Sequence, residues 1–471
     1  MSNSSKPEGM RKLGRNMLIF SIGSFASKMM GYFLIPFYTA ILSNAEYGIY
    51  DIVITTVNLV FPIFTLLITE STMRFALDKD SNYKKIFTIS FLSICVGTLI
   101  AILFSPLILF SSVYKEYYWF FVGYYLVYTV HTFCSQFVKG KEQTKEYAES
   151  GILGTAITLF LNILLMAIIK LGLVGYFWAT ILGTIFSIAY LWIRCNLFQN
   201  FCKLEKKDIV LFKEMLRYSI PIMPNSLSWW ISTSSDKYII SYFSGVAETG
   251  LYSIAYKIPS LMTVFTTIFF NAWQISAVED FGSEKSQRLY SKVYSYFFAS
   301  VVCIATLIIT FIKIICKFLF LNEFYRAWRF VPLLIMAYVF HDLATFMGSV
   351  YTSSKKTKML FYSTLVGAVV NIILNVLIIP YLGALGGALT TFISYFMVWF
   401  IRYIDIKKVI RIENQCTQDR ICLVLLLINT LFITLDIPFS YIYGLIITII
   451  IILMKYKIIQ EVLSKIIKIR K

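Results

Sequence analysis

The sequence predicts an all-α polytopic membrane protein with about 14 transmembrane helices. Its 471 residues are 58% hydrophobic and only 14% charged, whereas a soluble domain is about half apolar and about a quarter charged. Apolar runs of about 20 residues, the length that crosses a bilayer, recur along the whole chain. Basic residues separate these runs and form no single patch, so the net charge of +18 does not indicate a nucleic-acid-binding protein. Membrane lipids are therefore the expected surroundings, and no nucleic acid is expected as a partner.

The predicted spans follow one another with short connections. Lys6, Arg11 and Lys12 precede the first apolar run, which lacks a small-residue cleavage site, so we expect a retained span rather than a cleaved signal peptide. Pro221 and Pro224 are expected to kink the seventh span. The expected spans lie at about residues 13–42, 45–70, 84–110, 117–138, 148–170, 172–194, 213–243, 248–277, 289–320, 327–352, 358–381, 383–408, 420–436 and 438–456.

The distribution of basic residues predicts the orientation of the spans. With a cytoplasmic N-terminus, 34 of the 43 Lys and Arg residues lie in inner segments, six in outer segments and three within spans. Because cytoplasmic segments carry an excess of Lys and Arg, both termini are expected in the cytoplasm. The outer connections are short turns, such as 43–45 and 245–248, which leave little room for the acidic groups of an extracytoplasmic enzyme. We therefore expect no enzyme and no cofactor, and the eight cysteines contain no Cys-x-x-Cys pair that indicates a metal site.

The chain contains an internal repeat. Residues 45–52 match residues 247–254 at an offset of 202, with five of eight identical, and residues 144–162 match 357–375 at an offset of 213. Because each repeat has six spans, the repeats are parallel and are expected to enclose a central cavity. The predicted division is an N-terminal six-helix lobe (1–200), a C-terminal six-helix lobe (201–412), and two additional helices with a cytoplasmic tail (413–471).

Short motifs at the start of both repeats carry a family resemblance. The first repeat has Pro36-Phe37-Tyr38 and the turn at 46–50, and the second has Pro221-Ile222-Met223-Pro224 and the turn at 250–252. The chain resembles bacterial polysaccharide flippases of the multidrug/oligosaccharidyl-lipid/polysaccharide exporter superfamily. The resemblance implies a monomeric transporter of the bacterial cytoplasmic membrane. Its expected substrate is an undecaprenyl-diphosphate-linked oligosaccharide repeat unit, moved from the inner to the outer leaflet by alternating access. Association with a polymerase or with glycosyltransferases is expected as well.

Lysines within spans are the first candidates for substrate binding, since an ionisable group in hydrocarbon is costly and is usually functional. Lys28 lies about 20 Å into a core of about 30 Å, and Lys257 lies about 13 Å below the outer turn. Both are expected to meet the diphosphate. The alternatives are that Lys28 extends to the outer surface and that Lys257 forms an ion pair within the second lobe. Basic residues at the inner mouth either gather the anionic substrate or only fix topology; these are Arg15, Arg74, Lys139 and Arg217.

Polar groups in the second lobe are candidates for ion coupling. Asp236, Asn371, Asn375 and Thr390, with Thr391, are oxygen donors at comparable depth, and one carboxylate plus neutral oxygens suits Na⁺. Otherwise these side chains only hydrogen-bond between helices, and Asp236 with its neighbour Lys237 is solvated at the outer interface.

His341 and Asp342 are candidates for a proton relay. The alternative is that Asp342 only neutralises Lys257. Na⁺ and H⁺ are therefore both candidate coupling ions, and no other metal is expected. His131, in the fourth span, is expected to be a packing residue.

Two other functions compete with the flippase. A cation-coupled multidrug exporter of the same superfamily generally has acidic and aromatic cavity walls, whereas the candidate cavity residues here are lysines. A membrane polysaccharide polymerase requires an outer catalytic segment, which the short outer turns do not provide.

Overall fold

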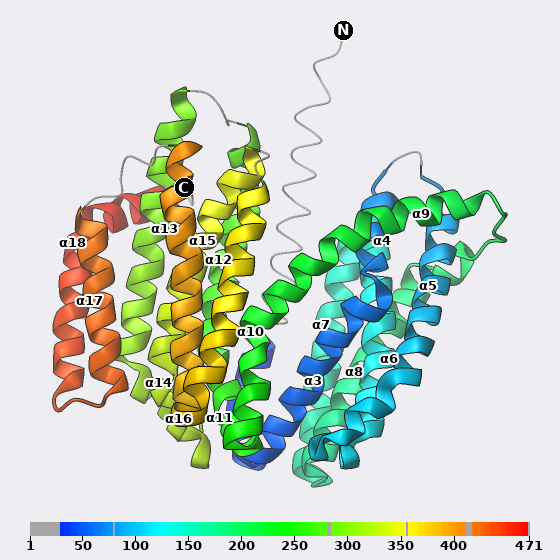
Figure 1. Cartoon of the computed structure of the whole chain (residues 1–471), viewed down its shortest axis with the longest axis horizontal. Helices are drawn as coiled ribbons and strands as arrows, with labels where there is room; N and C mark the ends of the chain where they lie inside the picture. Colours follow the sequence, from blue (N-terminus) through cyan, green and yellow to red (C-terminus); the bar gives the residue numbers. More distant parts are fainter. Residues whose placement is uncertain (1–28, 79–80, 280–283, 355–356, 411–416, 470–471) are drawn as a thin grey trace. The chain divides into compact units, whose positions relative to one another are not determined.

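The described part of the chain is built from helices. The computed structural model describes residues 29–78, 81–279, 284–354, 357–410 and 417–469 (Figure 1). Within these ranges nine helices are long and apolar enough to cross a membrane, and one of these stretches, Lys358–Lys408, contains 51 residues. At a rise of about 1.5 Å per residue such a stretch is more than twice the thickness of a bilayer core. It bends at Gly383, between the two spans predicted at 358–381 and 383–408. The predicted fold class is confirmed.

The described residues pack into two compact units. Unit 1 contains the residues up to Leu42 together with Ile49–Trp230, and unit 2 contains Ser43–Gly48 together with Ile231–Lys471. Two helices, α3 (Asn44–Thr65) and α10 (Met223–Ser244), contribute residues to both units. These units are groups of residues that pack together and are not defined by the internal repeat. They therefore do not test the predicted lobe boundaries at residues 200 and 412, which stay a prediction.

Unit 1 has an aromatic core where α5, α6 and α8 meet. The Phe87 ring centroid lies 5.0 Å from that of Phe133 and 4.8 Å from that of Phe137, and all three side chains are buried. Besides its parts of α3 and α10, unit 1 contains α2 (Ile35–Ile41), α4 (Ile68–Ala76), α5 (Tyr83–Phe104), η1 (Ser105–Phe110), α6 (Ser112–Gly140), α7 (Thr144–Asn162), η2 (Ile163–Ile168), α8 (Gly172–Arg194), η3 (Leu197–Asn200), α9 (Asp208–Ser219) and η4 (Ile220–Ile222).

The second predicted span is broken. Leu66 and Leu67 both have φ of 51°, which ends α3 and starts α4 within the span expected to be continuous over 45–70. Pro62 in the last turn of α3 removes one helical hydrogen bond. The end of α3 packs directly against the backbone of Gly97 in α5. A Cβ on Gly97 would lie only 2.2 Å from the Phe64 carbonyl oxygen, so a larger residue would not fit. The broken helix thus packs closely against α5 just before the break, a contact that the sequence pattern does not reveal.

The seventh predicted span is kinked as expected. α9 ends at Ser219, the 3₁₀ turn Ile220–Ile222 contains Pro221, and α10 begins at Met223, one residue before Pro224. The ring of a proline fixes φ and removes an N–H donor, so the chain changes direction here without a loop.

Unit 2 is organised around α15 (Val331–Ser353), which is the most buried long helix that the structure describes, with 83% of an 18-residue stretch inside the protein. It packs against α12, α13, α16 and α17. The other elements are α11 (Val246–Ala255), α12 (Lys257–Glu279), α13 (Glu284–Thr310), α14 (Ile312–Leu319), η5 (Asn322–Arg329), α16 (Thr357–Asp405), η6 (Ile406–Lys408), α17 (Thr417–Thr434) and α18 (Ser440–Ile469).

The repeated turn motifs meet within unit 2. Gly48 and Gly250 occupy the same place in the two copies of the motif, and each packs against the backbone of the other copy. A Cβ on Gly48 would lie 2.1 Å from the Val246 carbonyl oxygen, and one on Gly250 would lie 1.9 Å from the Asn44 carbonyl oxygen. The glycines of the repeat are therefore required by a reciprocal backbone contact between the starts of α3 and α11.

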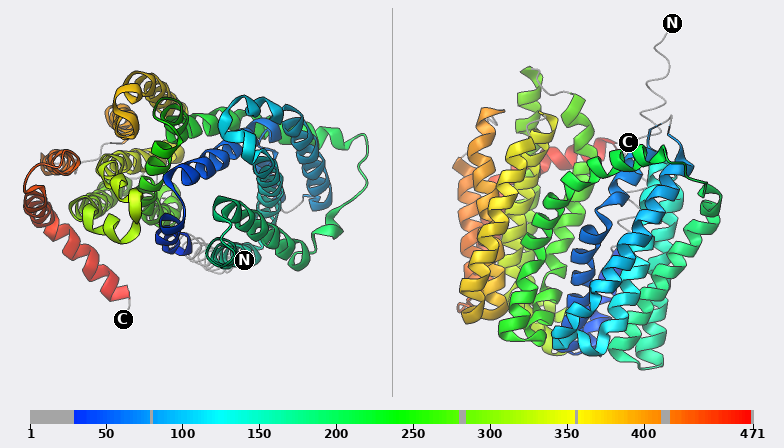
Figure 2. Two further views of the ribbon diagram at one scale, coloured as in Figure 1. Left: turned by 90° about the horizontal axis from the view of Figure 1, so that it is seen from below. Right: turned by 45° about the vertical axis from the view of Figure 1, so that its right-hand side comes forward.

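The C-terminal helices α17 and α18 form a hairpin that packs on α13 (Figure 1). Buried polar side chains join the three helices: Asn429 Nδ2 donates to Thr310 Oγ1 at 3.0 Å, and Thr310 Oγ1 lies 2.9 Å from Thr448 Oγ1. Towards its C-terminal end α18 leaves the other helices of unit 2 (Figure 2).

Two basic residues assigned to the inner surface by the loop count are instead buried in unit 2. Arg402 is 1% exposed and donates to Ser363 Oγ (2.9 Å), to the Ala344 carbonyl (2.8 Å) and to Thr364 Oγ1 (2.9 Å). Lys455 is 2% exposed and pairs with Asp419. Both residues lie near the ends of predicted spans, 383–408 and 438–456, and neighbouring helices rather than water surround their side chains.

Candidate functional site

A buried carboxylate, Asp236 in α10, forms the centre of the candidate site in unit 2. It is fully buried, so the expectation of a solvated position at the outer interface is wrong. Its Oδ2 accepts hydrogen bonds from the Tyr252 hydroxyl and from Thr391 Oγ1 at 3.2 Å, and its Oδ1 accepts one from the Lys237 backbone N–H at 3.0 Å. The Tyr256 hydroxyl lies 3.5 Å from the same Oδ2. Tyr252 of α11, Tyr256 directly after α11 and Thr391 of α16 thus place hydroxyl groups around one buried carboxylate of α10.

A second polar group adjoins this carboxylate through neighbouring residues of α10 and α16. Asn375 Nδ2 donates to Asn371 Oδ1 at 3.0 Å, and Thr390 Oγ1 donates to Asn375 Oδ1. Ser235, the residue before Asp236, donates from Oγ to Asn371 Oδ1 at 3.2 Å. Both asparagines and Thr390 are fully buried. The structure therefore brings together Asp236, Asn371, Asn375 and Thr390, which the sequence had placed only by depth.

This polar cluster has the chemistry of a site for a hard monovalent cation. It offers one carboxylate together with neutral hydroxyl and amide oxygens, and such oxygen ligands suit hard cations better than soft or imidazole-binding metals. Asn371 Nδ2 has no hydrogen-bond partner in the described part of the chain. The hydrogen-bond network of the cluster is thus incomplete at this amide nitrogen, although Asn371 Oδ1 accepts from both Ser235 and Asn375.

A row of aromatic rings connects Asp236 with the His341–Asp342 pair of α15. The Tyr252 and Tyr256 ring centroids are 5.1 Å apart, Tyr338 lies 6.2 Å from Tyr256, and His341 lies 5.6 Å from Tyr338. His341 Nδ1 lies 3.1 Å from Asp342 Oδ1, and Asp342 is 1% exposed. The two buried carboxylates of the candidate site therefore belong to one continuous polar and aromatic region within unit 2.

Lys257 begins α12, directly after the bend at Tyr256 that separates α12 from α11. Its side chain is partly buried. An ammonium group at the first residue of a helix adds its charge to the partial positive charge of the helix amino end. This end of α12 is therefore a suitable place for an anion, next in sequence to the tyrosine that contacts Asp236.

The other predicted substrate contacts are less informative. Lys28 and Arg15 lie outside the described residues. Arg74 forms an exposed ion pair with Asp78, with 2.7 Å between Nη1 and Oδ1, and Arg217 is exposed on α9. Lys139 Nζ lies 4.3 Å from the Tyr147 ring centroid.

His131 has the packing environment expected for it, with Nε2 lying 3.1 Å from Ser187 Oγ between α6 and α8.

Sequence reasoning missed the tyrosines of the site and one polar contact. Tyr252 and Tyr256 were not assigned a role, although their spacing of four residues puts both on the same helical face. Gln136 Nε2 donates to Glu70 Oε1 at 2.7 Å between α6 and α4 of unit 1, so Glu70 is also an acidic group within the protein. Its position after the broken α3 carries no signal in the hydropathy pattern.

The helices and this polar cluster define a polytopic α-helical membrane protein with the fold of MOP superfamily transporters. An inward-facing multidrug resistance MATE family transporter of that superfamily aligns with a TM-score of 0.70 at 13% identity, covering 82% of this chain and 97% of that one. The Lipid II flippase MurJ in an inward closed conformation aligns with a TM-score of 0.69 at 13% identity, and the alignment covers 95% of this chain and 100% of MurJ. A MOP superfamily transporter from Pyrococcus furiosus aligns with a TM-score of 0.61 at 14% identity, covering 84% and 95%.

Residues 13–274 match the family described as "Polysaccharide biosynthesis protein", and residues 221–377 match the family MatE. Because the first match covers more than half of the chain, this chain belongs to the polysaccharide biosynthesis protein family. The resemblance read from the sequence is confirmed at this level.

Relatives in Methanocaldococcus jannaschii are also membrane proteins. The uncharacterized membrane protein MJ1068 is 24% identical over 330 residues, which are 65% of this chain and 61% of that protein. The uncharacterized membrane protein MJ1375 is 28% identical over 200 residues, which are 41% of this chain and 47% of that protein. The chain thus spans about three fifths and about half of the length of these curated relatives.

Proposed function

We propose that this protein is a flippase that moves an undecaprenyl-diphosphate-linked oligosaccharide repeat unit from the inner to the outer leaflet of the bacterial cytoplasmic membrane. The observation that carries the proposal is the match of residues 13–274 to the polysaccharide biosynthesis protein family. The fold shared with the Lipid II flippase MurJ over 95% of this chain supports it. Transport proceeds by alternating access, both termini are cytoplasmic, and the protein acts as a monomer beside a polymerase or glycosyltransferases.

Lys257 is the proposed anion contact within the described residues. Its ammonium group stands at the amino end of α12, where the charge of the side chain and the helix dipole have the same sign. Bent helices whose amino ends face the substrate are a common way for transporters to bind an anionic group. In this proposal Lys28 supplies a second positive charge, and Arg15, Arg74 and Arg217 attract the lipid diphosphate to the inner mouth.

Ion coupling is proposed at the Asp236 cluster. Asp236, Asn371, Asn375 and Thr390 would hold Na⁺ through carboxylate, amide and hydroxyl oxygens. H⁺ is the other candidate ion, carried by the pair of His341 and Asp342, which lies along the aromatic row from Asp236. The two ions are distinguished by measuring transport in inward gradients of Na⁺ at constant pH and of H⁺ without Na⁺.

A cation-coupled multidrug exporter is the second candidate function, favoured by the MatE match at residues 221–377. The buried Asp236 is compatible with this function, because acidic groups bind cationic drugs. The charge of Lys257 opposes it, since an ammonium group repels a cationic cargo in a medium of low polarity.

A depletion experiment tests the proposed function. Loss of the protein is expected to leave lipid-linked repeat units in the inner leaflet, detected by their inaccessibility to a glycan-modifying enzyme added outside. Complementation with Lys257→Gln is expected to fail, whereas Lys313→Gln, a lysine in a half-exposed ion pair with Asp436, complements. Accumulation in the outer leaflet would indicate a polymerase, and normal polymer with drug sensitivity would indicate the exporter. Either result would reject the flippase.

A further inference from the structure

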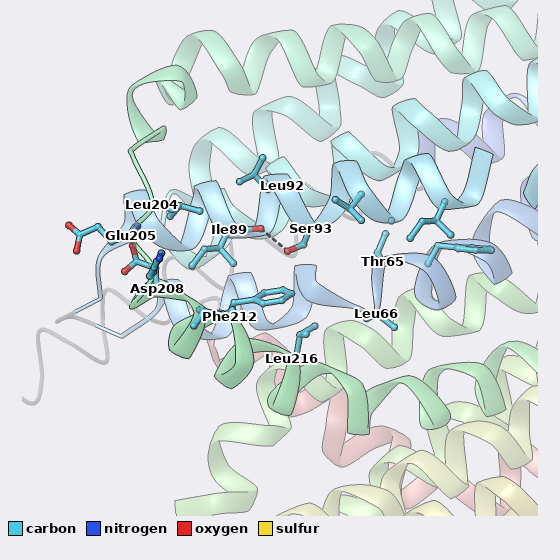
Figure 3. Close-up of a pocket in the computed structure, with 16 residues that line it drawn as sticks. Thr65, Leu66, Ile89, Leu92, Ser93, Leu204, Glu205, Asp208, Phe212 and Leu216 are labelled. Atoms are coloured by element: carbon cyan, nitrogen blue, oxygen red, sulfur yellow. Dashed lines mark hydrogen bonds between the residues drawn. The ribbon is translucent and has the colours of Figure 1, made fainter. Parts of the chain in front are cut away.

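An apolar groove in unit 1, which shares no residue with the polar cluster described above, lies between α5 and α9 (Figure 3). Its volume is about 740 Å³, within the range of pockets that bind small molecules. One wall is formed by α5, whose Leu92, Val96 and Ile100 are 50%, 57% and 42% exposed. The opposite wall is formed by Phe212 and Leu216 of α9 (Figure 3). The groove therefore presents apolar side chains that the described residues of unit 1 leave exposed.

The groove is as long as one leaflet of a bilayer is deep. Its wall on α5 runs from Ile89 to Ile100, which is about 17 Å along a helix. Half of a hydrocarbon core of about 30 Å is about 15 Å. A single acyl chain that enters from one membrane surface would thus fill the groove. An undecaprenyl chain is several times longer than the groove and would leave most of its length outside.

The break between α3 and α4 lines one part of the groove. Phe64, Thr65 and Leu66 line it there, where the chain leaves α3. The Phe64 carbonyl oxygen approaches Gly97 of α5 closely at this place. Irregular backbone at membrane depth is tolerated only where protein surrounds it or where it lines a cavity, and this break lines the groove.

Lysines surround the open end of the groove. Lys85 Nζ and Asp208 Oδ1 are 2.6 Å apart, and Lys207 Nζ and Glu205 Oε2 are also 2.6 Å apart, so both carboxylates near the opening already have a cationic partner. Lys206 lines the groove itself, and no ion pair to it occurs among the residues that the structure describes. Its ammonium group is therefore available to an anion at the position where a lipid headgroup would lie.

The geometry points to a binding site for an anionic phospholipid, with one acyl chain in the groove and the phosphate beside Lys206. Juxtamembrane lysines attract anionic lipids, and each contributes to the affinity near the membrane surface. The apolar groove, its length of one leaflet and the lysine without an ion pair at its opening together fit an amphiphile of this charge. The site is separate from the proposed transport function, since none of its residues belongs to the polar cluster of unit 2.

Native mass spectrometry of the purified full chain with added phosphatidylglycerol or phosphatidylcholine tests the proposal. The wild-type chain is expected to bind phosphatidylglycerol more tightly. Lys206→Gln should weaken this binding about fivefold, the effect of one basic residue on anionic lipid, and should leave phosphatidylcholine binding unchanged. Lys203→Gln is the control, because Lys203 is exposed on the same segment and does not line the groove, so its loss should have little effect. Equal weakening by both variants, or equal binding of the two lipids, would overturn the assignment of the phosphate to Lys206.

A second pair of variants tests the groove. Ser93→Trp places an indole between Leu92 and the α9 wall and should abolish bound phosphatidylglycerol. Leu103→Trp adds the same side chain at a position of α5 that is 76% exposed and outside the groove, and should retain it. Equal retention by both variants would show that lipid binds elsewhere. Displacement of phosphatidylglycerol by undecaprenyl phosphate at equal concentration would assign the groove to the carrier lipid and would also refute the proposal.

Discussion

Disruption of the buried ion pair of Lys455 and Asp419 in unit 2 should strongly destabilise the protein. The two side chains are 3% and 11% exposed, and Lys455 Nζ also lies 5.1 Å from the Phe298 ring centroid. Lys455→Met would leave a carboxylate without a cationic partner, and Asp419 Oδ2 already has no hydrogen-bond partner among the described residues. Breaking a buried pair in this way costs about 3–5 kcal/mol. The lower part of this range is expected here, because a polar pocket of about 510 Å³ adjoins the pair and admits water.

A double variant distinguishes the cost of leaving one buried charge unpaired from the contribution of the ion pair itself. Lys455→Met with Asp419→Leu removes both charges, and replacement of a buried ion pair by apolar side chains is often neutral or stabilising. Most of the loss should therefore be recovered. Lys313→Met is the matched control, because Lys313 and Asp436 are 38% and 46% exposed and exposed pairs contribute only about 0.2–1 kcal/mol.

Denaturant unfolding of the purified protein in detergent micelles measures these differences, with the intrinsic tryptophan fluorescence as the signal. A cost of about 3 kcal/mol lowers the folding constant about 100-fold. The reasoning fails if Lys455→Met is no more destabilising than Lys313→Met, or if the double variant is as unstable as Lys455→Met alone.

Three further predictions follow from the described contacts. Saturating Na⁺, at about 100 times its Kd, should stabilise the wild-type chain by about 2.7 kcal/mol; Asp236→Asn should abolish this shift, and an unchanged shift would exclude Asp236 as a ligand. Gly250→Ala should destabilise by about 1–3 kcal/mol through overpacking, as measured by thermal unfolding, and an unaffected protein would refute the close backbone contact. The Glu205 backbone N–H and then Lys85 lower the pKa of Asp208 from its ordinary value of 3.8. Asp208 therefore stabilises the fold above pH 3.8 and loses this effect as pH falls through its lowered pKa, so Asp208→Asn should differ from wild type in unfolding scans at pH 6 and converge with it in strong acid.

The fold class and the helix positions were predictable from sequence because lipid as solvent imposes a simple pattern. Each span needs about 20 apolar residues, and every backbone group must be satisfied inside the helix. The kink at Pro221 was predictable for a local reason, since proline cannot donate a backbone hydrogen bond. The break at Leu66 and Leu67 was not, because neither residue favours a positive φ and the close approach of Phe64 to Gly97 appears only in the tertiary structure.

The candidate site was predictable in its members but not in its arrangement. Asp236, Asn371 and Asn375 were conspicuous as polar residues within apolar runs. Hydropathy gives only their depth, however, and the hydroxyl donors Tyr252 and Tyr256 are ordinary members of a hydrophobic helix. Only the tertiary structure brings these hydroxyls, from α11 and the bend after it, to the Asp236 carboxylate of α10.

The sequence by itself determined that this chain crosses the membrane many times and contains a repeat, because both properties reside in the order of residues along the chain. Tertiary structure alone decided what the repeat does in space: Gly48 and Gly250, 202 residues apart, bring two backbones into contact. It also decided that Arg402 and Lys455 are buried with partners rather than hydrated at the surface. The physical reason is common to these cases. A charge or a glycine acquires its role from the atoms packed around it, and those atoms come from distant parts of the chain.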